Sequence, residues 1–257
     1  MTDVSAPIGV FDSGVGGLTV LRALVRALPH ESFLYLGDTA RLPYGPKPPA
    51  MVRAFAYELT DELIARGVKA IVVACNTASA AALPDLADAV PVPVWGVIEP
   101  GVAAALAAHA RVGGTGVVGV LGTAGTVASG TYQRALAARG QDAWARACPL
   151  FVPIVEEGVS DTAIARLVAE HYLADRPRDL RTLILGCTHY PPLAETLRGV
   201  LGPDVALVDS ASATAEAVAR ALRAAGLARG ARPGGVRHLV TGDVASYAHV
   251  ARVLDGP

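Results

Sequence analysis

Lysine is almost absent from this chain, and so are the long apolar runs that cross a membrane. Lys47 and Lys69 are the only lysines, against 20 arginines. Lys47 lies in a Pro/Gly-rich turn and Lys69 directly precedes a strand-like run, so neither is persuasive as the Schiff-base residue of a pyridoxal phosphate enzyme. No stretch of about 18 uninterrupted apolar residues occurs, and no membrane span is expected. The start, MTDVSAP, lacks a basic segment ahead of an apolar one, so we expect no secretory signal.

Cysteine is scarce as well, and the motifs of common cofactor sites are missing. Cys75, Cys148 and Cys187 are an odd number in a chain of 257 residues, which predicts free thiols in a reducing cytoplasm. Their spacing fits neither a zinc nor an iron–sulfur site. There is no GK[ST] phosphate loop, and GVGGLT (14–19) lacks the last glycine of a dinucleotide fingerprint. We therefore predict that the protein uses no cofactor and no metal.

The net charge of -1 limits the choice of partners. It provides no electrostatic reason to expect a nucleic acid or an anionic membrane surface. We therefore expect neither as a partner.

Short apolar runs alternate along the chain with longer stretches of helical periodicity. Strands are predicted at 7–11, 32–37, 69–74, 92–97, 116–121, 150–155, 182–186 and 204–209, with a weaker one at 236–242. Helices are predicted over stretches that include 18–28, 51–66, 101–110, 161–173 and 212–225. This alternation is typical of an α/β fold with mostly parallel sheets that are buried on both faces. In such sheets, ligands bind at the carboxyl ends of the strands.

The two halves of the chain resemble each other weakly. When Cys75 is aligned with Cys187, the strand-like runs before them coincide as well. We interpret this as an internal duplication, which predicts two pseudo-symmetric lobes with the active site in the cleft between them. The first lobe is expected to be discontinuous, formed by residues 1–98 and 210–257, and the second to span residues 99–209.

Two of the cysteines, Cys75 and Cys187, each end a strand and precede a turn into a predicted helix. Backbone N–H groups at a helix N-terminus favour an anion, so we expect both thiols to have a pKa below the usual value of about 8.5. A buried cysteine can also be a simple packing residue, and we keep that interpretation for Cys148. Two thiols at equivalent ends of facing lobes favour chemistry in a shared cleft.

Two titratable residues are expected next to these thiols. Asp12 ends the first strand and can exchange a proton with the thiol of Cys75, although an aspartate there can also cap a helix. His189 is two residues after Cys187 and can carry protons near neutral pH; the alternative is a hydrogen-bonded surface histidine. In the internal alignment Asp12 falls on Gly122, so the two lobes provide different helpers.

Small polar residues follow the strand ends. They are Ser13, Asn76, Thr77, Thr123 and Thr188, and each alone would be read as a helix cap. Together with neighbouring N–H groups they predict a neutral hydrogen-bonding site for carboxylates. Tyr44, in RLPYG, either covers a ligand or belongs to a Pro/Gly turn. Glu156 can bind an ammonium group, while Glu157 can equally be a solvated charge.

These motifs resemble one known family, the glutamate racemases. The similar segments are FDSGVGGLTVL, GDTARLPYG, ACNTAS, FVPIVEEG and GCTHYP, in order between about residue 8 and residue 210. The resemblance implies a cofactor-independent isomerase that interconverts L- and D-glutamate and supplies D-glutamate for peptidoglycan synthesis and cell wall biogenesis, and so for cell shape. It also implies a small-molecule substrate, two α/β lobes and commonly a homodimer.

The resemblance also implies roles for individual residues. Cys75 would take the α-proton from D-glutamate and Cys187 from L-glutamate, with Asp12 and His189 assisting. The substrate would be bound by Asp12, Ser13, Pro43, Tyr44, Gly45, Cys75, Asn76, Thr77, Thr123, Glu156, Cys187, Thr188 and His189.

Three alternatives remain at this stage. The chain could be a related racemase for aspartate or a hydantoin, although aspartate racemases usually have histidine in place of Ser79 and lack the histidine of CTHYP. It could be a related decarboxylase, but that type has one active cysteine where this chain has two. It could also be a non-catalytic amino-acid-binding protein, which would not exchange the α-hydrogen.

Overall fold

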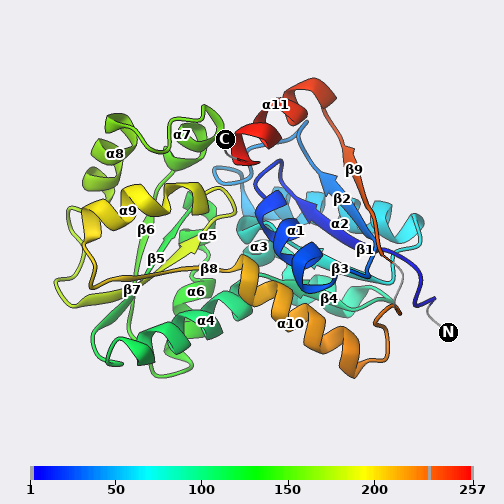
Figure 1. Ribbon diagram of the computed structural model, residues 1–257, viewed down its shortest axis with the longest axis horizontal. Helices are drawn as coiled ribbons and strands as arrows, with labels where there is room; N and C mark the ends of the chain where they lie inside the picture. Colours follow the sequence, from blue (N-terminus) through cyan, green and yellow to red (C-terminus); the bar gives the residue numbers. More distant parts are fainter. Residues whose placement is uncertain (1–2, 231–232, 256–257) are drawn as a thin grey trace.

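The computed structural model describes residues 3–230 and 233–255, and its strands form two separate parallel sheets (Figure 1). The first sheet has the order β4-β3-β1-β2-β9 and the second β6-β5-β7-β8. The strands are β1 (Ile8–Asp12), β2 (Phe33–Gly37), β3 (Ala70–Val73), β4 (Val94–Gly96), β5 (Val117–Gly122), β6 (Ala143–Ala147), β7 (Leu180–Gly186), β8 (Ala206–Asp209) and β9 (Val236–Val240). The predicted α/β class with two sheets is confirmed.

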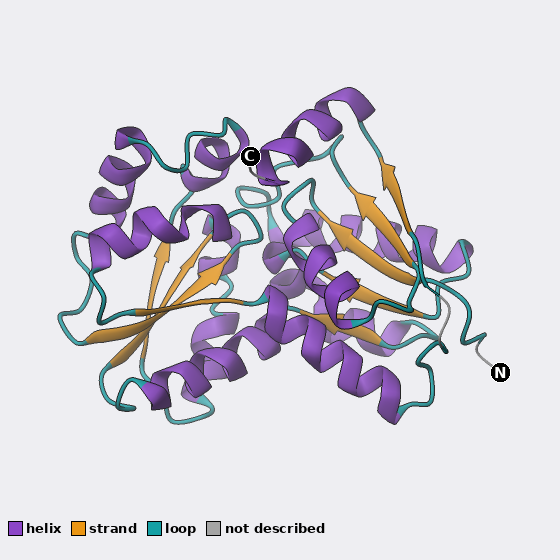
Figure 2. Ribbon diagram, viewed as in Figure 1, coloured by secondary structure: helices purple, strands orange, loops and turns teal. Residues whose placement is uncertain are grey.

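Helices pack around both sheets (Figure 2). They are α1 (Leu18–Ala27), α2 (Pro49–Ala65), α3 (Asn76–Ala89), α4 (Ile98–Arg111), α5 (Ala124–Ala128), α6 (Thr131–Ala137), α7 (Phe151–Glu156), α8 (Ala163–Leu173), α9 (Ala194–Leu201), α10 (Ala211–Ala224) and α11 (Val244–Asp255), with the short 3₁₀ helix η1 (Pro191–Leu193) before α9. Within the described residues, none of these helices combines the length and the apolar character needed to span a membrane.

The two sheets share one topology. If β1 to β4 correspond to β5 to β8, the orders β4-β3-β1-β2 and β8-β7-β5-β6 are identical. This correspondence aligns β3, which leads to Cys75, with β7, which leads to Cys187. The pseudo-symmetry inferred from the weak internal similarity is therefore confirmed by the strand order.

Strand β3 shows why the apolar runs lack polar alternation. Ala70 and Val72 pack into the core on one face of the sheet, whereas Ile71 and Val73 pack into the core on the other. All four side chains are fully buried. Because helices cover both faces of a parallel sheet, its central strands must be apolar on both sides.

One predicted strand is wrong. Residues 151–155 of this run lie in helix α7 instead, and Leu150 is its N-cap residue. Its buried side chains are Phe151, Ile154 and Val155, which have the i, i+3, i+4 spacing of one helix face. In so short an apolar run, strand and helix patterns are hard to distinguish.

The real strand at this place in the second lobe, β6, lies a few residues earlier and was missed. Its sequence, AWARA, contains little apolar surface apart from Trp144, and all its residues are only partly buried. Strand β6 lies at the edge of its sheet, so one of its long sides has no neighbouring strand to cover it. The internal duplication was the signal that could have found it, because β2 requires a counterpart after β5.

The end of the chain returns to the first sheet. After β8, helix α10 contacts both α1 and α4, and strand β9 then pairs with β2. In Figure 1, β9 and α11 lie on the same side of the molecule as β1 and β2. The exact lobe limits at 98/99 and 209/210 stay a prediction, and the outermost residues of the predicted first lobe, 1–2 and 256–257, lie outside the described residues.

A buried ion pair ties this returning segment to the first sheet. The Lys69 side chain is 0% exposed and its Nζ donates to Glu31 Oε2 at 2.5 Å. The same ammonium donates to the carbonyls of Val4 and Leu227, each at 2.8 Å. The backbone N–H of Arg229 donates to the second oxygen of Glu31. One cation and one carboxylate therefore connect the N-terminal segment with the segment after α10.

We expect Lys69→Met to lower the free energy of unfolding by about 3–5 kcal/mol, because it leaves the Glu31 carboxylate buried without its cation. Urea unfolding followed by circular dichroism measures this change. Arg66→Met is the matched control, since its pair with Glu62 is exposed and should contribute less than about 1 kcal/mol. An equal loss in the two variants would contradict the role given to Lys69.

Candidate active site

A small cavity lies where the loops after β1, β3, β5 and β7 meet. It has a volume of about 30 Å³ and is lined by Ser13, Gly14, Leu42, Pro43, Tyr44, Gly45, Cys75, Asn76, Thr77, Thr123, Val152, Glu156, Cys187, Thr188 and His189. Every residue predicted for the site except Asp12 is on this wall. Gly14 and Leu42 were missed although they lie within the recognised motifs. Val152 was missed because its segment was interpreted as a strand; on a helix it precedes Glu156 by one turn.

Cys75 lies between β3 and α3, as the predicted strand end before a helix requires, and is the N-cap residue of α3. The low pKa expected for its thiol is wrong. Its sulfur accepts a hydrogen bond from Ala78 N at 3.4 Å and lies 3.7 Å from Ser13 Oγ. Burial raises the pKa of the Cys75 thiol to about 12, and the charge of Asp12 acts in the same direction. The two hydrogen bonds oppose this change but do not outweigh it. At neutral pH, Cys75 is therefore a protonated thiol.

Cys187 directly follows β7, but no α-helix begins there. A turn and the short helix η1 come first, and α9 starts only at Ala194. The predicted helix N-terminus behind this sulfur is therefore wrong. Cys187 is 7% exposed, and a negative charge on its sulfur acts to raise the pKa of Cys75. The two sulfurs come from opposite lobes and line one cavity.

His189 is a buried cation beside Cys187. Burial by itself would lower the pKa of His189. Hydrogen bonds to Cys187 and Glu156, together with the charge of the sulfur, outweigh burial and raise the pKa of the imidazole to about 10. Its Nε2 is 3.1 Å from Glu156 Oε1. The other ring nitrogen packs against the loop before α1, where a Cβ on Gly16 would lie 2.4 Å from Nδ1.

Asp12 is completely buried and lies outside the cavity wall. Its Oδ2 accepts a hydrogen bond from Gly14 N at 2.9 Å, and Oδ1 accepts one from Thr188 Oγ1 of the second lobe at 3.4 Å. It does not cap α1, whose N-cap residue is Gly17 with no side-chain hydrogen bond. Burial raises the pKa of Asp12, against the opposing charge of His189. A carboxyl group with a raised pKa can accept and return a proton.

The lobes contact each other through polar groups around the cavity. Thr77 Oγ1, from the first lobe, is 2.9 Å from Thr123 Oγ1 and 3.2 Å from Thr126 Oγ1 of the second. Gly125 N donates to the carbonyl of Gly45 at 2.8 Å. These contacts close the cleft, and the remaining space has room for only about two water molecules.

The sequence left two alternatives open, one for Tyr44 and one for the neighbouring glutamates Glu156 and Glu157. The Tyr44 hydroxyl donates to Asp38, and its ring lies 5.6 Å from that of Phe55. Tyr44 therefore belongs to a packed turn and also lines the cavity. Of the two glutamates of α7 and its end, Glu156 reaches the cavity, whereas Glu157 is exposed to solvent.

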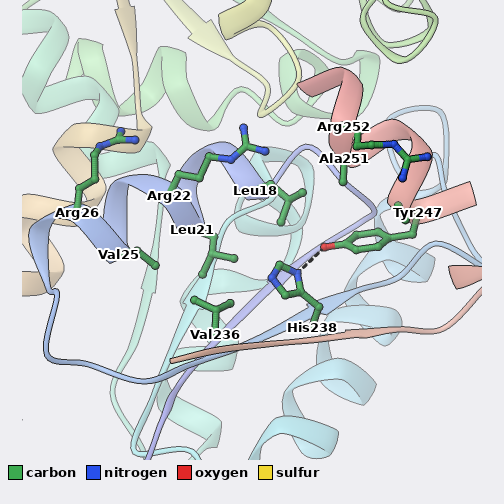
Figure 3. A pocket seen from close by; sticks show the side chains of 11 residues that line it. Leu18, Leu21, Arg22, Val25, Arg26, Val236, His238, Tyr247, Ala251 and Arg252 are labelled. Atoms are coloured by element: carbon green, nitrogen blue, oxygen red, sulfur yellow. Dashed lines mark hydrogen bonds between the residues drawn. The ribbon is translucent and has the colours of Figure 1, made fainter. Parts of the chain in front are cut away.

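A larger hollow lies elsewhere, between α1, β9 and α11 (Figure 3). It has a volume of about 650 Å³, and apolar residues such as Leu18, Leu21 and Val25 line it together with three arginines. His238 and Tyr247 form a hydrogen bond of 2.7 Å across its wall. Along the described part of this wall, no thiol or carboxylate is present. The smaller cavity, with two thiols, is therefore the candidate active site.

Comparisons with known proteins agree with this geometry. The family model for Asp/Glu/hydantoin racemases matches residues 8–218. Glutamate racemase of Thermus thermophilus is 59% identical over 254 residues, covering 99% of this chain and 94% of that protein. The solved structure of a glutamate racemase from Bacillus anthracis has a TM-score of 0.93 at 40% identity, covering 99% of this chain and 96% of that one. The structure from Francisella tularensis in complex with D-glutamate has a TM-score of 0.89 at 35% identity, covering 98% and 95%.

Proposed function

The chain belongs to the Asp/Glu/hydantoin racemase family, and from that premise we propose that it interconverts L- and D-glutamate by proton transfer between two thiols. The observation that carries this proposal is the pair Cys75 and Cys187, which line one closed cavity from opposite lobes. The similarity to glutamate racemases over nearly the whole chain supports glutamate as the substrate.

The proposed reaction inverts one carbon without a cofactor. One sulfur, as the thiolate, takes the α-proton, and the electron pair of the C–H bond remains on carbon as a carbanion conjugated with the carboxylate. The other sulfur, as the thiol, then delivers its proton to the opposite face. Cys75, with a pKa of about 12, is suited to enter as the thiol when L-glutamate binds. The positively charged His189 can stabilise the negative charge on Cys187 in that state.

The carboxylates of glutamate would be held by neutral donors. The hydroxyls of Ser13, Thr77, Thr123 and Thr188 and the amide of Asn76 face this cavity, and no lysine or arginine is found along its described wall. Neutral donors hydrogen-bond a carboxylate without adding a positive charge that would shift the pKa values of the two thiols. This position and the family resemblance support a role for these residues in substrate binding.

Substrate entry requires the lobes to separate, because a space of about 30 Å³ cannot hold an amino acid. The polar contacts between Thr77 and Thr123, and between Gly125 and Gly45, would break on opening and reform around the bound substrate. Closure would exclude bulk water and protect the carbanion from random protonation.

The proposal is tested by incubating dialysed, chelator-treated protein with L-glutamate in heavy water. We expect loss of optical rotation and gain of α-deuterium at the same time, with no need for pyridoxal phosphate or metal. A reducing agent should preserve activity, because active-site thiols oxidise. Aspartate in a parallel incubation serves as the substrate control and should be converted far more slowly.

Three outcomes would contradict this reading. A need for an added cofactor would exclude the two-thiol mechanism. Faster conversion of aspartate would change the substrate. Binding of glutamate without any deuterium exchange would identify a non-catalytic binding protein.

We also propose that the product, D-glutamate, supplies peptidoglycan synthesis in the cytoplasm. This is what the family resemblance implies, and it is supported by the high identity to glutamate racemases. Growth of a D-glutamate-requiring bacterial strain after expression of this chain tests it. The resemblance also implies a homodimer. This remains a prediction, which a measurement of molecular mass by light scattering tests.

A further inference from the structure

One hydrogen bond between the lobes involves a residue that the sequence analysis did not select. Tyr132, on α6 of the second lobe, is 0% exposed, and its hydroxyl donates to Asn76 Oδ1 at 2.6 Å. Asn76 is the first residue of α3 in the first lobe, directly after Cys75, and lines the cavity. The pair therefore connects the two lobes at the active site.

The other end of the Asn76 amide is unsatisfied. Within the described residues, Asn76 Nδ2 is buried and has no hydrogen-bond partner. A buried donor without a partner is destabilising, and native proteins retain few of them. Because Asn76 lines the cavity, a substrate acceptor there would satisfy this donor.

The hydroxyl of Tyr132 determines which atom of the Asn76 amide, the oxygen or the nitrogen, is left without a partner. An asparagine amide can turn over, which exchanges its oxygen and its nitrogen. In the reversed orientation, Oδ1 would take the place of Nδ2 and repel a carboxylate. Burial raises the pKa of Tyr132, and the charge of Cys187 adds to this, so the hydroxyl remains a proton donor. Among the hydrogen bonds of the described residues, Asn76 Oδ1 is the only acceptor for this hydroxyl, at 2.6 Å. The reversed amide would leave the buried O–H without an acceptor, so the hydroxyl selects the oxygen of Asn76 and leaves the nitrogen for the ligand.

We propose that Tyr132 is a positioning residue that orients the Asn76 amide to donate its Nδ2 hydrogen to a substrate carboxylate. This inference rests on the proposed function. Because Tyr132 and Asn76 belong to different lobes, the orientation is imposed only when the cleft is closed. Closure and carboxylate recognition are thereby linked through a single hydroxyl group.

The test is a double-mutant cycle with Tyr132→Phe, Asn76→Ala and the double variant. Tyr132→Phe removes one oxygen and retains the ring that fills the core. We expect each single change to raise KM for glutamate about ten- to hundredfold, with kcat within about threefold, because the lost bond serves binding. The double variant should have nearly the same KM as Asn76→Ala alone.

Tyr172→Phe is the matched control. Tyr172 is a buried tyrosine of the same lobe whose hydroxyl accepts a hydrogen bond from Leu150 N, away from the cavity. It should leave KM unchanged, and thermal unfolding of all variants shows that they are folded. If Asn76→Ala alone raises KM and Tyr132→Phe does not, or if the two effects multiply, the inference is wrong. A wild-type protein without any racemisation of glutamate would instead refute the proposed function.

Discussion

Replacing either Cys75 or Cys187 by alanine is expected to lower racemisation of glutamate about 10⁴-fold or more. Both sulfurs line the cavity. In the proposed mechanism each serves one face of the α-carbon, so the loss of either would interrupt both directions. The double variant should be hardly worse than the single variants, because the two groups act as one unit. Circular dichroism of the substrate measures racemisation, and proton NMR in heavy water measures α-exchange in the same samples.

Cys148→Ala is the control for loss of a buried thiol. Cys148 is 0% exposed, but it lies outside the cavity wall. Among the hydrogen bonds of the described residues, its sulfur makes one, to the carbonyl of Arg146 at 3.6 Å. Its replacement should change the rate less than about threefold. Racemisation retained by Cys75→Ala would exclude the two-thiol mechanism, whereas a large loss in Cys148→Ala would point to a general effect of core thiols.

The second large effect is expected from Asp12 and His189, the titratable residues next to the two thiols. Each should act mainly on one of the two proton transfers. His189 is hydrogen-bonded to Cys187, and the charge of Asp12 raises the pKa of Cys75. Asp12→Asn and His189→Asn should each slow the reaction by up to about 10²–10⁴-fold, the range of a general acid–base group. Asp12→Asn retains a side-chain oxygen that can accept from Gly14 N, so the loop should keep its shape.

Thermodynamics restricts where the asymmetry can appear. Enantiomers have equal free energy, so kcat/KM must remain equal in the two directions for every variant. The difference can therefore be seen only in kcat and KM separately, and in isotope effects. Asp12→Asn should raise the primary isotope effect on kcat/KM for α-deuterated D-glutamate more than for the L-enantiomer, and His189→Asn should do the reverse.

The structure suggests that the two helpers will not be equally selective. Asp12 also accepts a hydrogen bond from Thr188, and its charge acts on His189, so it is connected to both lobes. We expect the imbalance of isotope effects to be smaller for Asp12→Asn than for His189→Asn. Equal kcat/KM values for the unlabelled enantiomers check the assay. If both variants changed the two isotope effects alike, the pairing of helper and sulfur would be refuted, while the racemase activity would stand.

Much of the fold was predictable because it depends on local patterns. Central strands of a parallel sheet are apolar on both faces, so β1, β3 and β7 stand out in the sequence. The edge strand β6 lacks this signature and was missed, while the short helix α7 was interpreted as a strand. The residues of β6 are only partly buried, and the apolar run of α7 is too short for its period to be clear.

Most of the residues that line the cavity were also predictable, because carboxyl ends of parallel strands meet at one edge of a sheet. The motifs after β1, β3, β5 and β7 therefore had to converge, and the duplication indicated that the two edges face each other. Twelve of the residues named in advance line the cavity, which are Ser13, Pro43, Tyr44, Gly45, Cys75, Asn76, Thr77, Thr123, Glu156, Cys187, Thr188 and His189. Residue type and strand position indicated the two thiols and the polar residues beside them, whereas Pro43 and Gly45 were implied only by the family resemblance.

The charge state of the site was decided only by the tertiary structure. The sequence indicated acidic thiols at helix N-termini, but burial raises the pKa of Cys75, and no α-helix starts at Cys187. Asp12 proved to be a buried residue behind the wall, and Tyr132 reaches Asn76 from 56 positions away. Desolvation and contacts between lobes depend on which distant groups pack together, and a local sequence pattern contains no information about either.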